Sequence, residues 1–162
     1  MKRFPRWALI TVSGLCLVPV GNLLAALILT TSTNAVSIPF ATTDYNVSTG
    51  AAQLIKASAQ TLTILSSSAT WTLNVRALTS TFTFVPLLGD ANPNKPAGDL
   101  AVRAPATSAT FLALTTSNQV LSTGPKSGSN QTRVLDYRLN SNLNTDPPGT
   151  YTISVIYTLT SP

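Results

Sequence analysis

The sequence contains no histidine and no glutamate, and only one cysteine and one methionine in 162 residues. Without histidine, a serine or cysteine nucleophile has no imidazole base, which excludes the common catalytic triads. The single cysteine, Cys16, has no partner for a disulfide within the chain. The acidic residues are five scattered aspartates, and nothing in their spacing indicates the carboxylate pair of a glycosidase. We therefore expect a protein that is not an enzyme and needs no cofactor.

The N-terminal region has the layout of a secretory signal peptide. A basic segment at 2–6 precedes an apolar run over 7–29, and small polar residues follow. Thr33 and Ala35 occupy the two small-residue positions of a cleavage site, which makes Val36 the first residue of the mature chain. We expect a secreted or cell-surface protein. The apolar run is also long enough to span a bilayer, so an uncleaved anchor is the alternative.

Removal of the predicted signal peptide, residues 1–35, changes the charge balance. The whole chain has ten basic and five acidic residues and a net charge of +5. Three of the basic residues precede residue 7, so seven remain against five aspartates and the net charge falls to +2. These seven are dispersed along the chain, which argues against a nucleic-acid partner. Membrane contact is expected only through the signal segment.

Residues 36–162 predict a single domain built from β-strands. Helical periodicity is weak throughout, and a short helix over 50–60 is only an alternative to a strand there. The segments with strand patterning lie at 50–66, 70–78, 80–88, 100–104, 108–114, 118–123, 132–140 and 150–160. About seven to nine strands joined by turn-rich loops, among them 89–99 and 124–130, predict an antiparallel β-sandwich, Ig-like or jelly-roll-like. The last two strands are expected to form a hairpin.

One loop carries a pattern that suggests a metal ion. Asp90, Asn92 and Asn94 match the start of a calcium-binding loop, where oxygen ligands alternate along the chain. Lys95 stands where such loops usually have glycine, and Ala101 stands where they have a bidentate acid. Because Asn-Pro turns select the same residues for conformational reasons, we favour a turn and keep calcium as a weak alternative.

Two segments share a tripeptide pattern on the inward faces of predicted strands. One runs from Trp71 to Leu73 and the other from Tyr157 to Leu159. Large aromatic residues at such positions usually fill the core of a sandwich. If the two aromatic rings were exposed instead, they would form a stacking platform for carbohydrate.

These segments resemble the two signature regions of WxL domains, which are secreted bacterial domains associated with the cell wall. Such domains carry one Trp-x-Leu internally and a second in a final strand that opens with Gly-Thr-Tyr. Here Gly149 and Tyr151 match that opening, while Tyr157 stands where the second tryptophan belongs. Pilin-like secreted sandwiches share the Gly-Thr-Tyr opening. The resemblance implies a non-catalytic, surface-exposed β-sandwich.

The sequence thus predicts a structural or adhesive surface protein whose partners are cell-wall or envelope components, or copies of itself. An alternative is a subunit of a pilus or extracellular filament. In that case the segment from Val36 to Ser48 would add as a donor strand to a neighbouring subunit, beside its final strand. A carbohydrate-binding module is a further alternative.

Overall fold

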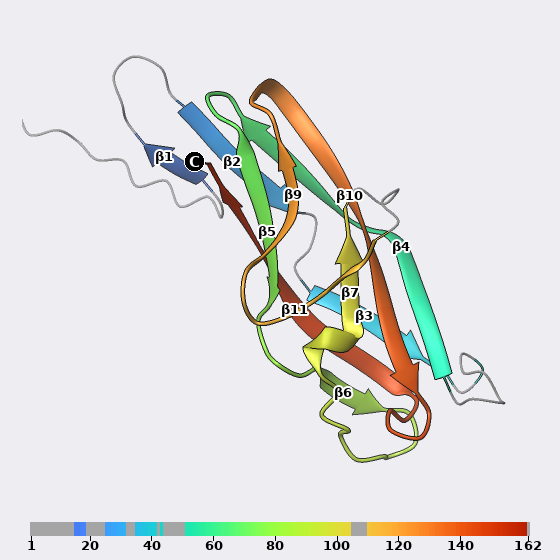
Figure 1. Cartoon of the computed structure of the whole chain (residues 1–162). Coiled ribbons are helices and arrows are strands. Elements are labelled where there is room, and N and C mark those ends of the chain that lie inside the picture. The colour runs from blue at the N-terminus through green and yellow to red at the C-terminus, as the bar shows by residue number, and fades with distance from the viewer. Residues whose placement is uncertain are drawn as a thin grey trace, which may run out of the picture.

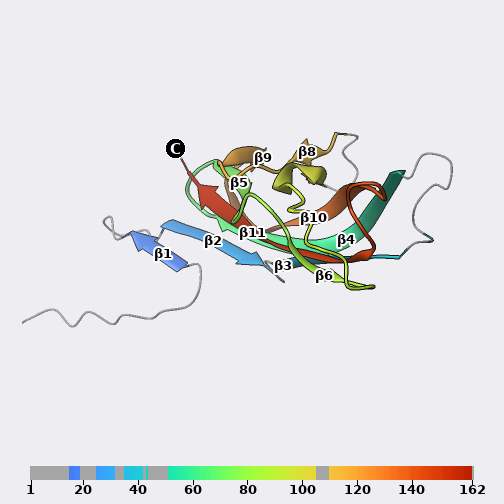
Figure 2. The ribbon, with the colours of Figure 1, turned by 90° about the horizontal axis from the view of Figure 1, so that it is seen from below.

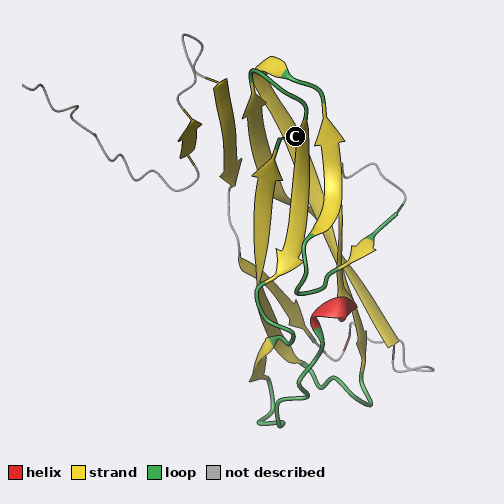
Figure 3. Ribbon diagram, turned by 60° about the vertical axis from the view of Figure 1, so that its left-hand side comes forward, coloured by secondary structure: helices red, strands yellow, loops and turns green. Residues whose placement is uncertain are grey.

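The computed structural model describes residues 15–18, 25–31, 35–41, 43, 51–104 and 110–161. These residues form two antiparallel sheets around one hydrophobic core, which confirms the predicted all-β sandwich. Figures 1 and 2 show the two layers, and Figure 3 shows that the strands run along the long axis of the molecule.

The first sheet has the strand order β1-β2-β4-β10-β7-β8. Its strands are β1 (Leu15–Val18), β2 (Ala25–Thr31), β4 (Ala51–Ser66), β10 (Ser127–Asn142), β7 (Leu100–Arg103) and β8 (Leu112–Ala113). The second sheet has the order β3-β11-β5-β9, and β6 pairs with β11 off this path. Its strands are β3 (Ala35–Phe40), β11 (Gly149–Thr160), β5 (Trp71–Ala77), β9 (Gln119–Gly124) and β6 (Thr83–Pro86). A short 3-10 helix, η2 (Ala97–Asp99), precedes β7.

Nine of these eleven strands begin at or after Ala35, which agrees with the predicted count. The segment 51–66 is a continuous strand and not a helix, as the alternation of Leu62 and Ile64 with threonine predicts. Both side chains are fully buried. On β10 the predicted inward set of Leu135, Tyr137 and Leu139 is also buried.

Two expectations about the C-terminal third of the chain are wrong. The loop predicted over 124–130 ends early, because β10 starts at Ser127, which pairs with Ser66 of β4. The last two strands are not a hairpin, because β10 pairs with β4 and β7 whereas β11 belongs to the other sheet. The connection over 143–148 crosses from one sheet to the other, and its length is what allows that crossing.

The final strand β11 is the centre of the second sheet. Its first half, Gly149–Ser154, pairs with β3, and Gly149–Thr152 also pairs with β6 on the other side. Its second half, Val155–Thr160, pairs with β5. Alternate residues point inward, and Tyr151, Ile153 and Val155 are buried in the core. β11 is therefore the strand that holds the second sheet together.

Two strands, β1 and β2, lie within the segment predicted as a signal peptide. Leu27–Thr31 of β2 pair with Leu62–Ser66 of β4, and Leu27 and Leu29 pack against the core. The end of β11 lies at the same end of the molecule as β2 (Figure 1). Cleavage after Ala35 remains a prediction, and it would remove the strand that covers this part of the β4 edge.

Candidate functional site

The two segments with the shared tripeptide pattern, 71–73 and 157–159, lie side by side in the second sheet. In the antiparallel pairing of β5 with β11, Leu73 lies opposite Leu159 and Val75 lies opposite Tyr157. Leu73 and Val75 are fully buried, and Leu159 and Tyr157 pack against the core from partly buried positions. Segments more than 80 residues apart in the sequence thus form one patch of the sandwich interior.

Trp71, the first residue of this pattern, is enclosed on several sides and only 1% exposed. The guanidinium carbon of Arg133 lies 5.0 Å from its ring centroid. Gly124 of β9 pairs with Trp71, and a Cβ at that glycine would collide with the indole ring. This burial confirms that Trp71 is a core residue, and its ring is not exposed for stacking on a carbohydrate.

Tyr157 links the two sheets through its hydroxyl group. That hydroxyl is hydrogen-bonded to the hydroxyl of Tyr137 on β10, which also donates to Gln60 Oε1 of β4 at 2.6 Å. Burial raises the pKa of Tyr137 to about 12, although the hydrogen bond with Tyr157 opposes it. The pKa of Tyr157 is raised even further. Burial is the larger cause, and the interaction with Tyr137 is the smaller one. Tyrosine at position 157 therefore supplies a hydroxyl contact that the tryptophan of the signature would not.

Gly149 and Tyr151 have structural roles at the start of β11. A Cβ on Gly149 would collide with the ring of Phe84 and would lie 2.5 Å from the carbonyl oxygen of Val85. Only glycine lets β6 approach this closely. Tyr151 is fully buried, with its ring centroid 4.7 Å from that of Phe84, and its hydroxyl donates to the Pro147 carbonyl at 2.7 Å.

The weak calcium candidates Asp90, Asn92 and Asn94 are exposed in the loop before η2. Asn92 Oδ1 accepts a hydrogen bond from the backbone N–H of Asn94 at 2.9 Å, and Asn94 has a φ of 53°. This is the local turn that asparagine favours. Across the described ranges, no three His, Cys, Asp or Glu residues gather in a way that could hold a metal ion.

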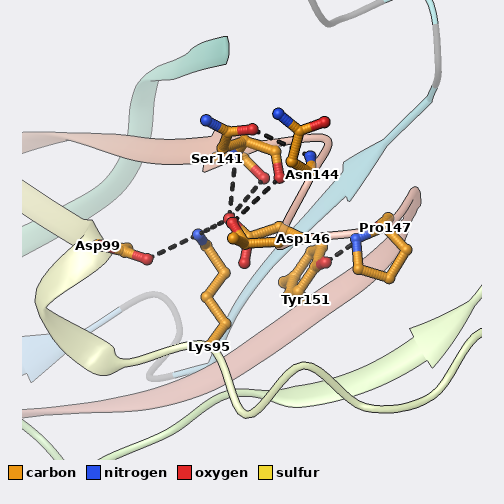
Figure 4. A network of polar contacts seen from close by, with 9 residues as sticks. Lys95, Asp99, Ser141, Asn144, Asp146, Pro147 and Tyr151 are labelled. Carbon is orange, nitrogen blue, oxygen red and sulfur yellow. Dashed lines mark hydrogen bonds and ion pairs between the residues drawn. The ribbon is translucent and has the colours of Figure 1, made fainter. Parts of the chain in front are cut away.

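The cation that occupies this region is a lysine of the same loop. Lys95 is 1% exposed, and its Nζ lies 2.7 Å from Asp99 Oδ2 and 2.7 Å from Asp146 Oδ2 (Figure 4). The Tyr151 ring closes another side, with its centroid 5.9 Å from Nζ. We call Lys95, Asp99 and Asp146 the buried ionic cluster; Lys95 and Asp146 are buried, and Asp99 lies at its edge with 37% of its side chain exposed. No pattern in the sequence predicts that these three residues form a cluster.

Asp146 is held by several donors in the connection between the sheets. Its Oδ2 atom accepts hydrogen bonds from Lys95 Nζ at 2.7 Å, from the Asn142 backbone N–H at 3.0 Å and from Ser141 Oγ at 3.2 Å. The backbone N–H of Asp146 donates to the Asn142 carbonyl at 2.6 Å, which fixes the turn. The cluster therefore ties the loop before η2 to the crossing between β10 and β11.

A second ion pair, Arg103 with Asp136, lies on β7 and β10. Arg103 Nη2 is 2.6 Å from Asp136 Oδ2, and the backbone N–H of Ser58 donates to Asp136 Oδ1 at 2.8 Å. Burial raises the pKa of Asp136, but the Ser58 hydrogen bond and the Arg103 guanidinium outweigh it and leave the pKa below its ordinary value. Ser58, with a φ of 49°, lies where the register between β4 and β10 shifts. The pair thus stabilises a bulge of the first sheet.

Within the described part of the chain, no helix has the length and apolar character needed to cross a membrane. Comparison with protein-family models and with curated proteins finds no match for this sequence.

Proposed function

We propose that the protein is an exported, non-catalytic β-sandwich with a structural or adhesive role at the bacterial cell surface, in contact with the cell wall or envelope. The observation that carries the proposal is the pairing of the two signature segments. Leu73 and Leu159 lie opposite each other on β5 and β11, and Gly149 opens the same strand. The two segments that resemble those of WxL domains therefore form one structural unit, which supports the proposal.

The surfaces of the second sheet suit such a role. The outward positions of β5 and β11 carry mainly hydroxyl and amide groups, at Thr72, Asn74, Thr152, Ser154 and Thr158, and they are partly exposed. Only 9% of the whole sequence is charged. A surface with hydrogen-bonding groups and few charges can contact a polymer or a neighbouring protein without a large desolvation cost.

The test begins with export and then measures wall binding. The full chain, expressed in a bacterial host, should appear outside the cytoplasm with Val36 at its N-terminus. The purified mature chain should co-sediment with intact peptidoglycan sacculi and should stay in solution when the sacculi are first digested to soluble fragments. A chain that keeps residues 1–35, stays in the cytoplasm and does not co-sediment with the sacculi would contradict the proposal.

A second candidate function, a filament subunit assembled by strand exchange, is favoured by the position of β3. This strand begins at Ala35, next to the predicted cleavage site, and it pairs with β11 from Ala35 to Phe40. Residues 36–40 of the predicted donor segment therefore occupy the place beside the final strand that a donor would take. The same strand supplied by a neighbour would link two subunits.

A cysteine pair distinguishes the two arrangements, because the chain after Ala35 contains no cysteine. Ser37 and Thr152 lie opposite each other in the register of β3 with β11. In the oxidised S37C/T152C double variant, a monomer with an internal disulfide supports a self-contained module. Disulfide-linked polymers that the single S37C variant does not form would support strand exchange instead.

A further inference from the structure

A primary amine and a carboxyl group face each other inside the protein, in contact and shielded from water. Lys95 Nζ lies 2.7 Å from Asp146 Oδ2, and the exposed fractions of the two side chains are 1% and 10%. The Tyr151 ring, itself flanked by Phe82 and Phe84, provides an apolar wall beside the amine. An amine and a carboxyl group held in this way are positioned to condense, because their approach no longer requires a chance collision.

Backbone hydrogen bonds hold in place the two segments that carry these groups. The Lys95 carbonyl accepts a hydrogen bond from the Phe82 backbone N–H at 2.9 Å, and Thr81 forms a β-bridge with Pro96. On the other side, the turn that carries Asp146 is closed onto the Asn142 carbonyl at 2.6 Å. The approach of amine to carboxyl is therefore part of the fold.

The surroundings of Asp146 suit the tetrahedral intermediate of an acyl transfer. The Asn142 backbone N–H and Ser141 Oγ both donate to Oδ2, the oxygen that also faces Lys95. Donors directed at one carboxyl oxygen stabilise the negative charge that this oxygen gains when a nucleophile adds to the carboxyl carbon. Asp99 Oδ2 lies 2.7 Å from the same Nζ, which places a second carboxylate where it can accept a proton from the attacking nitrogen.

We propose that Lys95 and Asp146 join in an intramolecular amide bond, with Asp99 as the proton carrier. A proton passes from the ammonium to Oδ1 of the Asp146 carboxylate, which leaves a free amine and a carboxylic acid whose carbonyl oxygen is Oδ2. The amine lone pair attacks Cγ, the N–C bond forms, and Asp99 takes a proton from the nitrogen. Asp99 returns that proton to the departing oxygen, the C–O bond breaks, and one water leaves. The ammonium and carboxylate become an amide and water, with no oxidant or reductant.

The bond would connect residues that are 51 positions apart. It would fasten the loop before η2 to the crossing between the two sheets, and it would restrict the unfolded chain as a disulfide does. The inference does not depend on the proposed surface function, since the reaction needs only the folded chain.

Intact-mass spectrometry of the purified mature chain tests the proposal directly. We expect a mass lower than that of the sequence by one water, and a branched tryptic peptide that joins Lys95 to Asp146. The K95R variant keeps the positive charge and should have the full sequence mass. Its matched control is K126R, at an exposed lysine, which should still lack one water. The folded D99N variant should lose the bond or form it more slowly, because the proton carrier is gone.

Three results would overturn the proposal. The first is a wild-type chain with its full sequence mass, which would make the cluster an ion pair only. The second is a loss of water that persists in K95R, because an aspartyl succinimide elsewhere would then explain it. The third is a D99N variant that forms the bond at the wild-type rate, which would remove Asp99 from the mechanism.

Discussion

Leu73 on β5 lies directly opposite Leu159 on β11, and this pairing joins the two segments that share the tripeptide pattern, 71–73 and 157–159. Leu73 is fully buried, whereas Leu159 lies near the end of its strand and is partly exposed. Leu73 should therefore contribute more to the stability of the fold than Leu159 does. The same pairing fixes the second half of β11, because residues Val155 to Thr160 all pair with β5.

We expect L73A to lower the free energy of unfolding by about 2 to 5 kcal/mol, because it removes buried methyl groups and leaves a cavity. The measurement is urea denaturation of the mature chain followed by circular dichroism. The matched control is L88A, at a leucine that is 77% exposed, where the change should stay within about 0.5 kcal/mol. Equal effects of the two substitutions would contradict the burial of Leu73.

The alternation of residues made much of this architecture predictable. In β5 the burial of successive residues alternates along the whole strand from Trp71 to Ala77, as the sequence pattern indicates. A period of two follows from strand geometry alone, so it needs no knowledge of what lies across the sheet. The existence of the strands, and the inward face of β11, could therefore be predicted from local sequence.

The buried ionic cluster could not be predicted in the same way. Lys95 lies in a loop rich in proline and asparagine, where a lysine is ordinarily exposed. Its burial depends on Asp146, which approaches only because the chain crosses from one sheet to the other after β10. That crossing contradicts the hairpin that the sequence suggests. The one local signal is the spacing of four residues between Lys95 and Asp99, which is common at exposed surfaces as well.

The start of β11 should be sensitive to any side chain at position 149. We expect G149A to destabilise the fold by about 1 to 3 kcal/mol, because the added methyl group forces Phe84 and the strand β6 away. G128A is the control, since a Cβ at Gly128 meets nothing within 4 Å. Thermal unfolding of both variants measures the difference. A G149A variant as stable as G128A would show that β6 does not approach β11 as closely as described.

The Asp136–Arg103 pair predicts how stability changes in acid. The folded-state pKa of Asp136 lies below the ordinary value of 3.8. The contribution of Asp136 to the free energy of unfolding is therefore complete above pH 3.8, and it is lost as the pH falls through the folded-state pKa. At neutral pH, we expect D136N to lower the free energy of unfolding by roughly 1.5 to 3 kcal/mol, typical of hydrogen bonds to charged groups.

Urea denaturation at a series of pH values measures this effect. The D136N variant should lose less stability than the wild type between neutral pH and the acid range. The control is D90N, at an exposed aspartate, which should follow the wild-type curve. If D136N and D90N gave parallel curves, the ion pair would not be the source of the acid dependence.

The hydroxyl pair between the sheets predicts a loss of stability in alkali. The folded-state pKa of Tyr137 is raised from 10.0 to about 12, so the folded chain keeps a proton that the unfolded chain releases above pH 10. The contribution of Tyr137 to the free energy of unfolding is therefore complete below pH 10 and disappears as the pH rises toward 12. We expect this contribution to be about 2 to 3 kcal/mol. In Y137F this part of the alkaline loss should be absent.

Absorbance near the phenolate band, recorded while the pH is raised, supplies an independent measurement. The chain has four tyrosines, and in the folded protein Tyr137 and Tyr157 should ionise only well above pH 10. Any ionisation of these two near pH 10 should therefore coincide with the loss of the circular dichroism signal. Reversible ionisation of all tyrosines near pH 10 in the folded protein would mean that the hydroxyl pair is accessible to water. That result would contradict the hydrogen bond between Tyr137 of β10 and Tyr157 of β11.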